Sequence, residues 1–281
     1  MLALFAALSA VTPTLARAQT PVPTVHATGD LVYLSVNAVL GGLTAAVTSA
    51  ARGGSFFAPF AHGTLGGAAS YAGKRVTASG FWGAGLVGRQ VSAAGASMVR
   101  GAAFGDGFTD TLFLPLGPGR LHVPIRGGAP VGYRLDLEEL AWVTYSLTRD
   151  HLSFDLGLSL SSGAFVFLGD ERLRGEGDNA LGRAAPGVIS MRRGAADLKA
   201  TLAHEQSHVA QLDYLKIVWG LPVEGWLRRS AGMPADSWTA HFESGIGHYP
   251  MLWLLTAPWP AHGSRPLERE AEHIERIRRG G

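Results

Sequence analysis

The stretch Ala203-His204-Glu205-Gln206-Ser207-His208-Val209-Ala210 contains the pattern H-E-x-x-H. Residues four apart lie on one face of a helix, so His204 and His208 would present their imidazoles side by side. Two imidazoles at this spacing can hold one Zn²⁺ at about 2.0–2.1 Å. Glu205 lies about a quarter-turn away, where its carboxylate can reach a water on the metal. The pattern therefore predicts two metal ligands and a general base for hydrolysis.

The residues around the pattern favour a helix. No Pro or Gly interrupts residues 195–219, and Leu198, Ala200 and Leu202 are good helix formers. Asp197 falls near the start, where the helix dipole favours a negative charge. The alternative is an ordinary amphipathic helix with two surface histidines, so a third ligand further along the chain is the feature that distinguishes the two interpretations.

A second motif supplies a candidate for that ligand. Pro266-Leu267-Glu268-Arg269-Glu270-Ala271-Glu272 begins a charged helix predicted over 266–278, with Pro266 in its first turn. The two motifs together resemble the glutamate class of zincins, zinc metallopeptidases in which E-x-x-x-D on a later helix follows H-E-x-x-H. The resemblance implies that Glu268 ligates Zn²⁺. It also implies that Glu272, standing where the family has Asp, orients His204 or His208.

Other residues compete for the third position. Glu224 lies close to the spacing found in other glutamate zincins, and the remaining candidates are Glu270, His241 and His248. Glu270 would point roughly 160° away from Glu268, into solvent or an ion pair. The metzincin pattern fails, because Gln211 and Tyr214 stand where its Gly and third His would be. Candidate donors to an oxyanion carry no motif of their own: His241, His248, Tyr249 and Tyr214.

Composition narrows the class of protein. The chain has 281 residues, 47% hydrophobic and 16% charged, with 38 glycines, which is typical of a folded, apolar protein. A formal net charge of +2 without a basic patch disfavours nucleic-acid binding. The chain has no cysteine, which excludes a thiol nucleophile and Cys-ligated zinc.

The first residues favour export. An apolar run over 2–11 precedes Ala16-Arg17-Ala18, an A-x-A-like cleavage site, so residues 1–18 are predicted as a signal peptide. A Pro/Thr-rich leader would follow over 19–29. We therefore expect a secreted, periplasmic or cell-envelope protein.

Residues 30–107 are predicted as a Gly/Ala-rich helical region. Small residues recur four apart, as in Gly63/Gly67, Ala69/Gly73 and Gly80/Ala84/Gly88, which lets helices approach closely. Charges and glycines make this region a poor membrane-spanning segment. Two interpretations stay open: tightly packed soluble helices under the catalytic part, which the charges favour, and peripheral contact with a membrane.

Residues 108–281 are predicted as a sheet followed by a zincin-like helical part. Strand-like alternation over 111–116, 120–125, 132–137, 141–147, 152–158 and 162–169 predicts an antiparallel sheet. A loop is expected over 169–186, then a strand over 188–191. In zincins an edge strand before the metal-binding helix borders the cleft and pairs with the substrate, which the resemblance places at 188–191.

The sequence as a whole predicts an α+β protein. The function that it predicts is a secreted zinc metallopeptidase with metal ligands His204, His208 and Glu268, the general base Glu205 and a protein or peptide substrate. The alternative is a cell-surface or membrane-associated interaction protein that uses the small-residue helices and carries a structural or vestigial zinc. The sequence gives no cleavage specificity and no oligomeric state.

Overall fold

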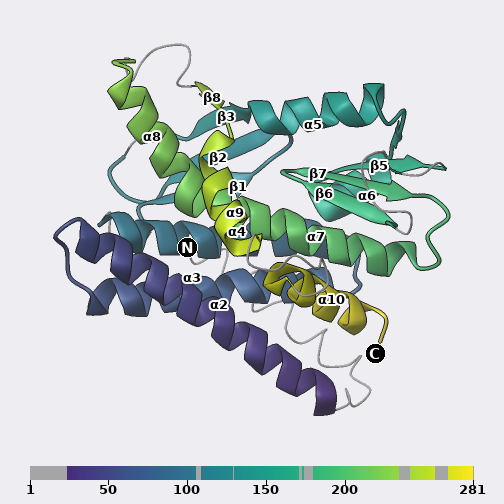
Figure 1. Cartoon of the computed structure of the whole chain (residues 1–281), viewed down its shortest axis with the longest axis horizontal. Helices are drawn as coiled ribbons and strands as arrows, with labels where there is room; N and C mark the ends of the chain where they lie inside the picture. The colour runs from purple at the N-terminus through teal and green to yellow at the C-terminus, as the bar shows by residue number, and fades with distance from the viewer. Residues whose placement is uncertain are drawn as a thin grey trace.

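The computed structural model describes residues 24–105, 109–128, 130–170, 173, 180–233, 241–256 and 265–280. The fold is α+β: a layer of long helices lies on one side, two small sheets lie on the other, and α7 (Leu198–Leu215) runs between them (Figure 1). A π-helical turn, η1 (Lys216–Gly220), continues α7 into α8 (Leu221–Ser230). The final helices are α9 (Tyr249–Thr256), which a 3-10 turn, η3 (Ile246–His248), precedes, and α10 (Pro266–Arg278).

The helical layer consists of α2 (Thr24–Ala51), α3 (Phe57–Thr77) and α4 (Ala84–Phe104). Small residues let these helices pack closely, as the sequence predicts. A Cβ added to Gly66 of α3 would lie 2.7 Å from the carbonyl oxygen of Gly95 on α4, and Gly41 of α2 lies equally close to the α3 backbone. Larger side chains at these positions would force the helices apart.

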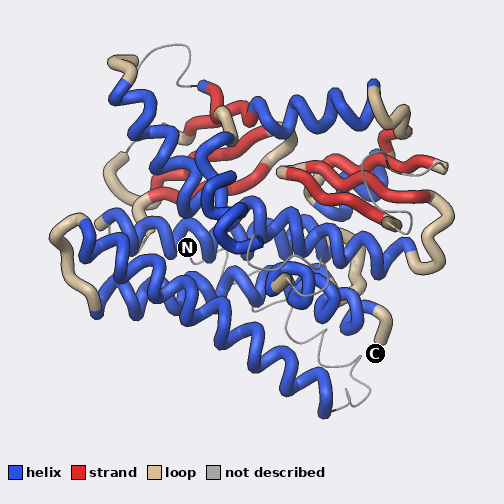
Figure 2. The backbone as a smooth tube through the Cα atoms, in the orientation of Figure 1, coloured by secondary structure: helices blue, strands red, loops and turns tan. Residues whose placement is uncertain are grey.

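Two four-stranded sheets replace the single antiparallel sheet predicted from the sequence (Figure 2). The first has the order β1-β2-β3-β8, with bounds Thr111–Pro115, Gly119–Pro124, Gly132–Asp136 and Phe242–Glu243. The second has the order β4-β5-β7-β6, with bounds Ser153–Phe154, Phe165–Gly169, Val188–Arg192 and Gly182–Ala185. Each sheet contains one parallel pair, β3 with β8 and β5 with β7. Parallel strands need a long connection, which includes several helices between β3 and β8 and includes β6 between β5 and β7.

Two predicted strands are wrong, the second only in part. Residues 141–147 belong to α5 (Leu137–Thr148), whose first turn is capped by Asp136: its side chain accepts hydrogen bonds from the backbone N–H groups of Glu138 and Glu139. The strand predicted over 152–158 is wrong in part: 153–154 form β4, and 156–158 begin α6 (Leu156–Ser162), which Asp155 caps in the same way. The caps satisfy N–H groups at the helix start, and this outweighs the alternating pattern.

The predictions for the two ends of the chain have different outcomes. The predicted signal peptide, 1–18, lies outside the described residues. The predicted leader, 19–29, overlaps α2, which begins at Thr24. The helix predicted over 266–278 is confirmed as α10, with Pro266 in its first turn.

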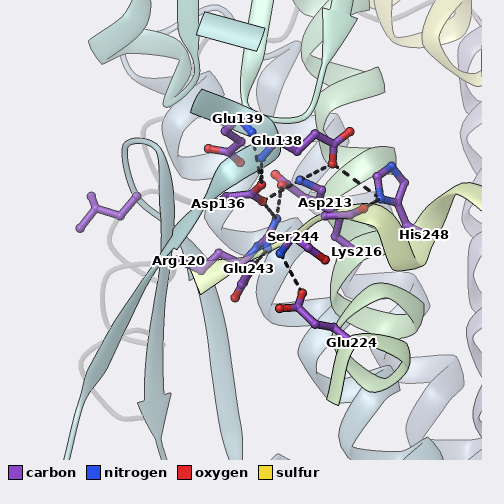
Figure 3. A network of polar contacts seen from close by, with 12 residues as sticks. Arg120, Asp136, Glu138, Glu139, Asp213, Lys216, Glu224, Glu243, Ser244 and His248 are labelled. Atoms are coloured by element: carbon purple, nitrogen blue, oxygen red, sulfur yellow. Dashed lines mark hydrogen bonds and ion pairs between the residues drawn. The ribbon is translucent and has the colours of Figure 1, made fainter. Parts of the chain in front are cut away.

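A buried network of charged side chains joins the first sheet to α5 and to the end of α7 (Figure 3). Lys216 of η1 lies 2.6 Å from Asp136 and 2.8 Å from Glu138, measured from Nζ to carboxylate oxygens. Arg120 of β2 pairs with Asp136 and Glu243. Arg89 of α4 pairs with Asp213 of α7 and Glu139 of α5. These pairs fix the orientation of α7 about its own axis.

Candidate metal site

Two histidines project from the middle of α7. Asp197 caps the helix by accepting a hydrogen bond of 2.9 Å from the backbone N–H of Ala200, so the helix begins seven residues before His204. The four-residue spacing brings the imidazoles of His204 and His208 together, with 3.2 Å between their Nε2 atoms. Both side chains stay partly exposed, at 14% and 21%.

Glu268 on α10 completes a group of three. Its Oε1 lies 3.1 Å from Nε2 of His204, and its Oε2 lies 3.1 Å from Nε2 of His208. Ligands about 2.05 Å from a tetrahedral zinc lie about 3.3 Å from one another. The 3.2 Å between the Nε2 atoms is close to this value, and each histidine lies 3.1 Å from a different oxygen of Glu268. Among the described residues, this is the group of three His or acidic side chains that could hold a metal ion. Two imidazoles and a carboxylate are also donors that Zn²⁺ takes.

The outer nitrogens of both imidazoles are held by other side chains. Nδ1 of His204 lies 3.0 Å from Oε2 of Glu275, and Nδ1 of His208 lies 2.8 Å from Oε1 of Gln211. A partner on Nδ1 fixes the ring and turns the lone pair of Nε2 toward the centre of the group.

The carboxylate beside His204 is not the one expected. Glu272 is half-exposed and lies 4.0 Å from Arg276, so its predicted contact with a ligand histidine is wrong. Four residues advance the helix by about 40° beyond Glu268, whereas seven residues, at Glu275, bring it back to within about 20° on the other side. The buried side of α10 is the side of Ala271 and Ile274, so Glu275 turns inward and Glu272 turns outward.

The charges of these side chains favour the binding of a cation. Burial alone would lower the pKa of His204, but hydrogen bonds with Glu268 and Glu275 raise it to about 10. Burial raises the pKa of Glu268, but hydrogen bonds with both histidines hold it well below its usual range. The hydrogen bond from His204 likewise lowers the pKa of Glu275. A proton on His204 thus supplies the positive charge that the two carboxylates require.

Glu270 is buried, so the expectation that it faces solvent is wrong and the ion pair is the alternative that holds. Its Oε2 lies 2.8 Å from Nζ of Lys74 and accepts a hydrogen bond of 2.7 Å from Nε2 of Gln211. Asn37 donates to its other oxygen. Because Gln211 also contacts His208, Glu270 lies behind a ligand histidine and anchors α10 to α2 and α3.

The competing ligands lie in other environments. Glu224 of α8 accepts hydrogen bonds from Arg228 and from the backbone N–H of Ser244. His248 is buried with its Nδ1 on the carbonyl oxygen of Gly245, and His241 is exposed. The remaining oxyanion candidates are also engaged: Tyr249 donates to Glu138, and Tyr214 is hydrogen-bonded to Thr44.

A cleft of ≈ 260 Å³ opens on the histidines, with Glu205, Leu212 and Leu252 among its lining residues. A second cleft, of ≈ 240 Å³, reaches the group from the side of Glu275. Glu205 lines both and is nearly buried: a Cβ added to Gly182 of β6 would lie 2.8 Å from its carboxylate carbon. Only a glycine leaves room for this carboxylate beside the strand.

The strand that borders the cleft is β6, which lies inside the predicted loop 169–186. The strand predicted to be the edge, β7, lies between β5 and β6. The sequence analysis missed β6 because four residues, Gly-Arg-Ala-Ala, give no strand signal, and because pairing with β7 creates the strand.

Comparisons with known proteins identify no relative: no family model, no curated protein and no solved structure matches this chain. The function is therefore inferred from the geometry of the site itself.

Proposed function

We propose that this chain is a zinc-dependent metallopeptidase, with His204, His208 and Glu268 as the ligands. The observation that supports the proposal most is the convergence of two Nε2 atoms and a carboxylate at 3.1–3.2 Å from one another, on two helices 60 residues apart. His204, His208 and Glu268 would together hold one zinc ion at the wall of the cleft. When bound there, Zn²⁺ supplies Lewis acidity and lowers the pKa of a water to about 7.

The residues of the chain would divide the remaining work. Glu205 lies one residue after His204 in the helix, lines the cleft, and accepts the proton of the attacking water as general base. Glu275 and Gln211 keep the two imidazoles oriented. The outer edge of β6, the last strand of its sheet among the described residues, would pair with an extended peptide, so that the peptide backbone passes the candidate ligands. The apolar wall of the cleft, which includes Leu212, Leu215 and Leu252, favours an apolar substrate side chain next to the cleaved bond.

A structural or vestigial zinc is the competing function. A structural zinc site is normally closed by four protein ligands, whereas this group has three among the described residues and opens to a cleft. This difference favours catalysis.

The test compares Glu205→Gln with the unchanged protein. Gln has the same shape but cannot accept the proton of a water, so the variant is expected to keep about one Zn²⁺ per chain and to lose roughly 10²–10⁴-fold in peptide hydrolysis. Metal analysis and cleavage of casein or of a peptide library measure the two quantities. Glu272→Gln, on the exposed side of α10, is the control and should keep both. Unchanged turnover in Glu205→Gln would contradict the proposal.

A further inference from the structure

The outer face of α2 has an inverted arrangement of side chains. The residues buried against the neighbouring helices are small: Gly41, Gly42, Ala45, Ala46 and Ser49. The large apolar residues point away from the protein, at 43–57% exposure: Val32, Val36, Val39, Leu40, Leu43 and Val47. A helix on the surface of a water-soluble protein normally turns its large apolar residues inward.

The face is uncharged over its whole length. No Asp, Glu, Lys or Arg occurs between Asp30 and Arg52, and Ser35 is the only polar residue among the exposed positions from 31 to 50. The helix is long and apolar enough to cross a membrane by length and composition. The exposed positions of α3 from 57 to 72 are also apolar, with Leu65 56% exposed, so apolar surface extends beyond α2.

Aromatic and basic side chains lie at the two ends of this layer. Phe57 is 84% exposed at the turn from α2 to α3, and Trp82 is 75% exposed at the turn from α3 to α4. Near Trp82, Arg278 lies against Gly80. The exposed Arg276 and Arg279 flank it at the end of α10, where they pair with Glu272 and Glu275. Aromatic rings favour the headgroup region of a bilayer, and arginines favour anionic headgroups.

We propose that the outer face of α2 lies in the surface of an anionic lipid bilayer, with the helix axis parallel to the membrane plane. A second copy of the chain fits this face less well. The small residues of α2, which are the kind that lets helices pair closely in a membrane, already contact the neighbouring helix of the same chain. Lipid chains require only apolar side chains and no complementary grooves.

The contacts of α10 favour the parallel orientation over a membrane crossing. Tyr33 of α2 donates to the carbonyl oxygen of Arg269, and Asn37 donates to Glu270. A crossing α2 would take this charged helix, with its exposed Arg269, into the hydrocarbon, where charged side chains are strongly unfavourable. With α2 in the plane of the membrane surface, α10 stays on the water side.

The absence of cysteine allows a direct test on the full chain. Val36→Cys, Leu43→Cys and Val47→Cys carry a spin label on the outer face, and Leu160→Cys, on an exposed site of α6, is the matched control. With vesicles of phosphatidylcholine and phosphatidylglycerol, the three labels should report one shallow depth, about 5–10 Å into the headgroup and acyl boundary. The control label should stay in water.

Charge variants supply the second measurement. Val39→Glu/Leu43→Glu should reduce flotation with these vesicles by about tenfold or more, because burial of two side chains is lost and two charges are added. Leu160→Glu should float as the unchanged protein does. Labels at depths that reach the bilayer centre would overturn the proposal in favour of a spanning helix. Strong label-to-label broadening without vesicle binding would overturn it in favour of a second copy.

Discussion

Two clusters of ionisable side chains share α7 and its extension η1, and they differ in what neutralises them. Around His204 and His208, the carboxylates of Glu268 and Glu275 lie against the imidazoles, Glu275 also pairs with Arg279, and the group opens to a cleft. Around Asp213 and Lys216, the chain supplies its own cations, and these cations are buried (Figure 3). The first arrangement suits a bound cation, and the second suits a structural clamp.

The distinction lies in convergence as well as charge. In the first cluster, the Nε2 atoms of the two histidines lie 3.2 Å apart, and each lies 3.1 Å from one oxygen of Glu268. In the second, Lys216 lies between Asp136 and Glu138, so the position that a metal would take is already filled by an ammonium group. A cluster of acids on its own would therefore be a poor guide to a metal site in this protein.

Loss of a ligand should have the largest effect. Glu268→Gln and the double variant His204→Ala/His208→Ala are each expected to lose the metal, because two or fewer donors compete poorly with water. Glu224→Gln, the rival acid on α8, should keep it. Metal content after dialysis measures this for each purified variant. Full zinc stoichiometry in the double variant would mean that the metal binds elsewhere, and the contrast between a metal site and a structural clamp would be wrong.

The clamp should respond in stability and not in metal content. Lys216→Met removes one partner from buried carboxylates, and breaking such a pair costs about 3–5 kcal/mol in the free energy of unfolding. Lys199→Met, on the exposed side of the same helix, is the matched control and should change it little. Urea denaturation gives the free energies, and metal analysis of the folded protein gives the occupancy. Equal stability of the two variants would mean that the network is no clamp.

A smaller effect distinguishes the two acids on α10. Glu275→Gln weakens the contact that orients His204 and should lower metal affinity by about 10–100-fold. Glu272→Gln should leave it unchanged, since that side chain is half-exposed beside Arg276. Competition with a chromophoric chelator measures both affinities. The opposite order would restore the assignment predicted from the sequence.

The candidate metal ligands could be predicted from the sequence, because each of the two motifs that contain them is a short stretch of the chain. His204 and His208 are four residues apart, and Glu268 begins a helix that charge and a first-turn proline mark clearly. The contact of Glu275 with His204 was not predicted, because Glu275 lies two helical turns after Glu268. Its inward direction depends on how α10 crosses α7, and no local pattern contains that angle.

The clamp around Asp213 and Lys216 could not be predicted from the sequence, because it also depends on how distant elements pack. Its pairs join residues far apart in the chain: Arg89 with Asp213 over 124 positions and Lys216 with Asp136 over 80. The sequence also predicts a strand over 141–147, just after Glu139, because Trp142 and its neighbours alternate in a strand-like way. The cap by Asp136 carried the opposite signal, and acidic residues in the next turn reinforce it.

Glu139 makes the clamp sensitive to pH, because burial raises the pKa of its carboxyl group. Burial raises the pKa of Glu139 to about 8. Arg89 lies 3.5 Å away and opposes this shift, but it also forms an ion pair with Asp213. The folded protein therefore holds a proton that the unfolded chain releases above its ordinary pKa of 4.5. The contribution of this group to stability is complete below that value and is lost as the pH rises toward about 8.

Glu139→Gln should remove this dependence, because Gln stays neutral at every pH. One proton corresponds to a slope of at most about 1.4 kcal/mol per pH unit in the free energy of unfolding. Urea denaturation of the unchanged protein and of Glu139→Gln, from about pH 5 to about pH 8, compares the slopes, with Glu272→Gln as an exposed control that should behave as the unchanged protein does. If Glu139→Gln keeps the same slope as the unchanged protein, the proton lies elsewhere. The clamp would then carry its excess of carboxylates in ionised form, and the contrast with the metal site would be one of geometry alone.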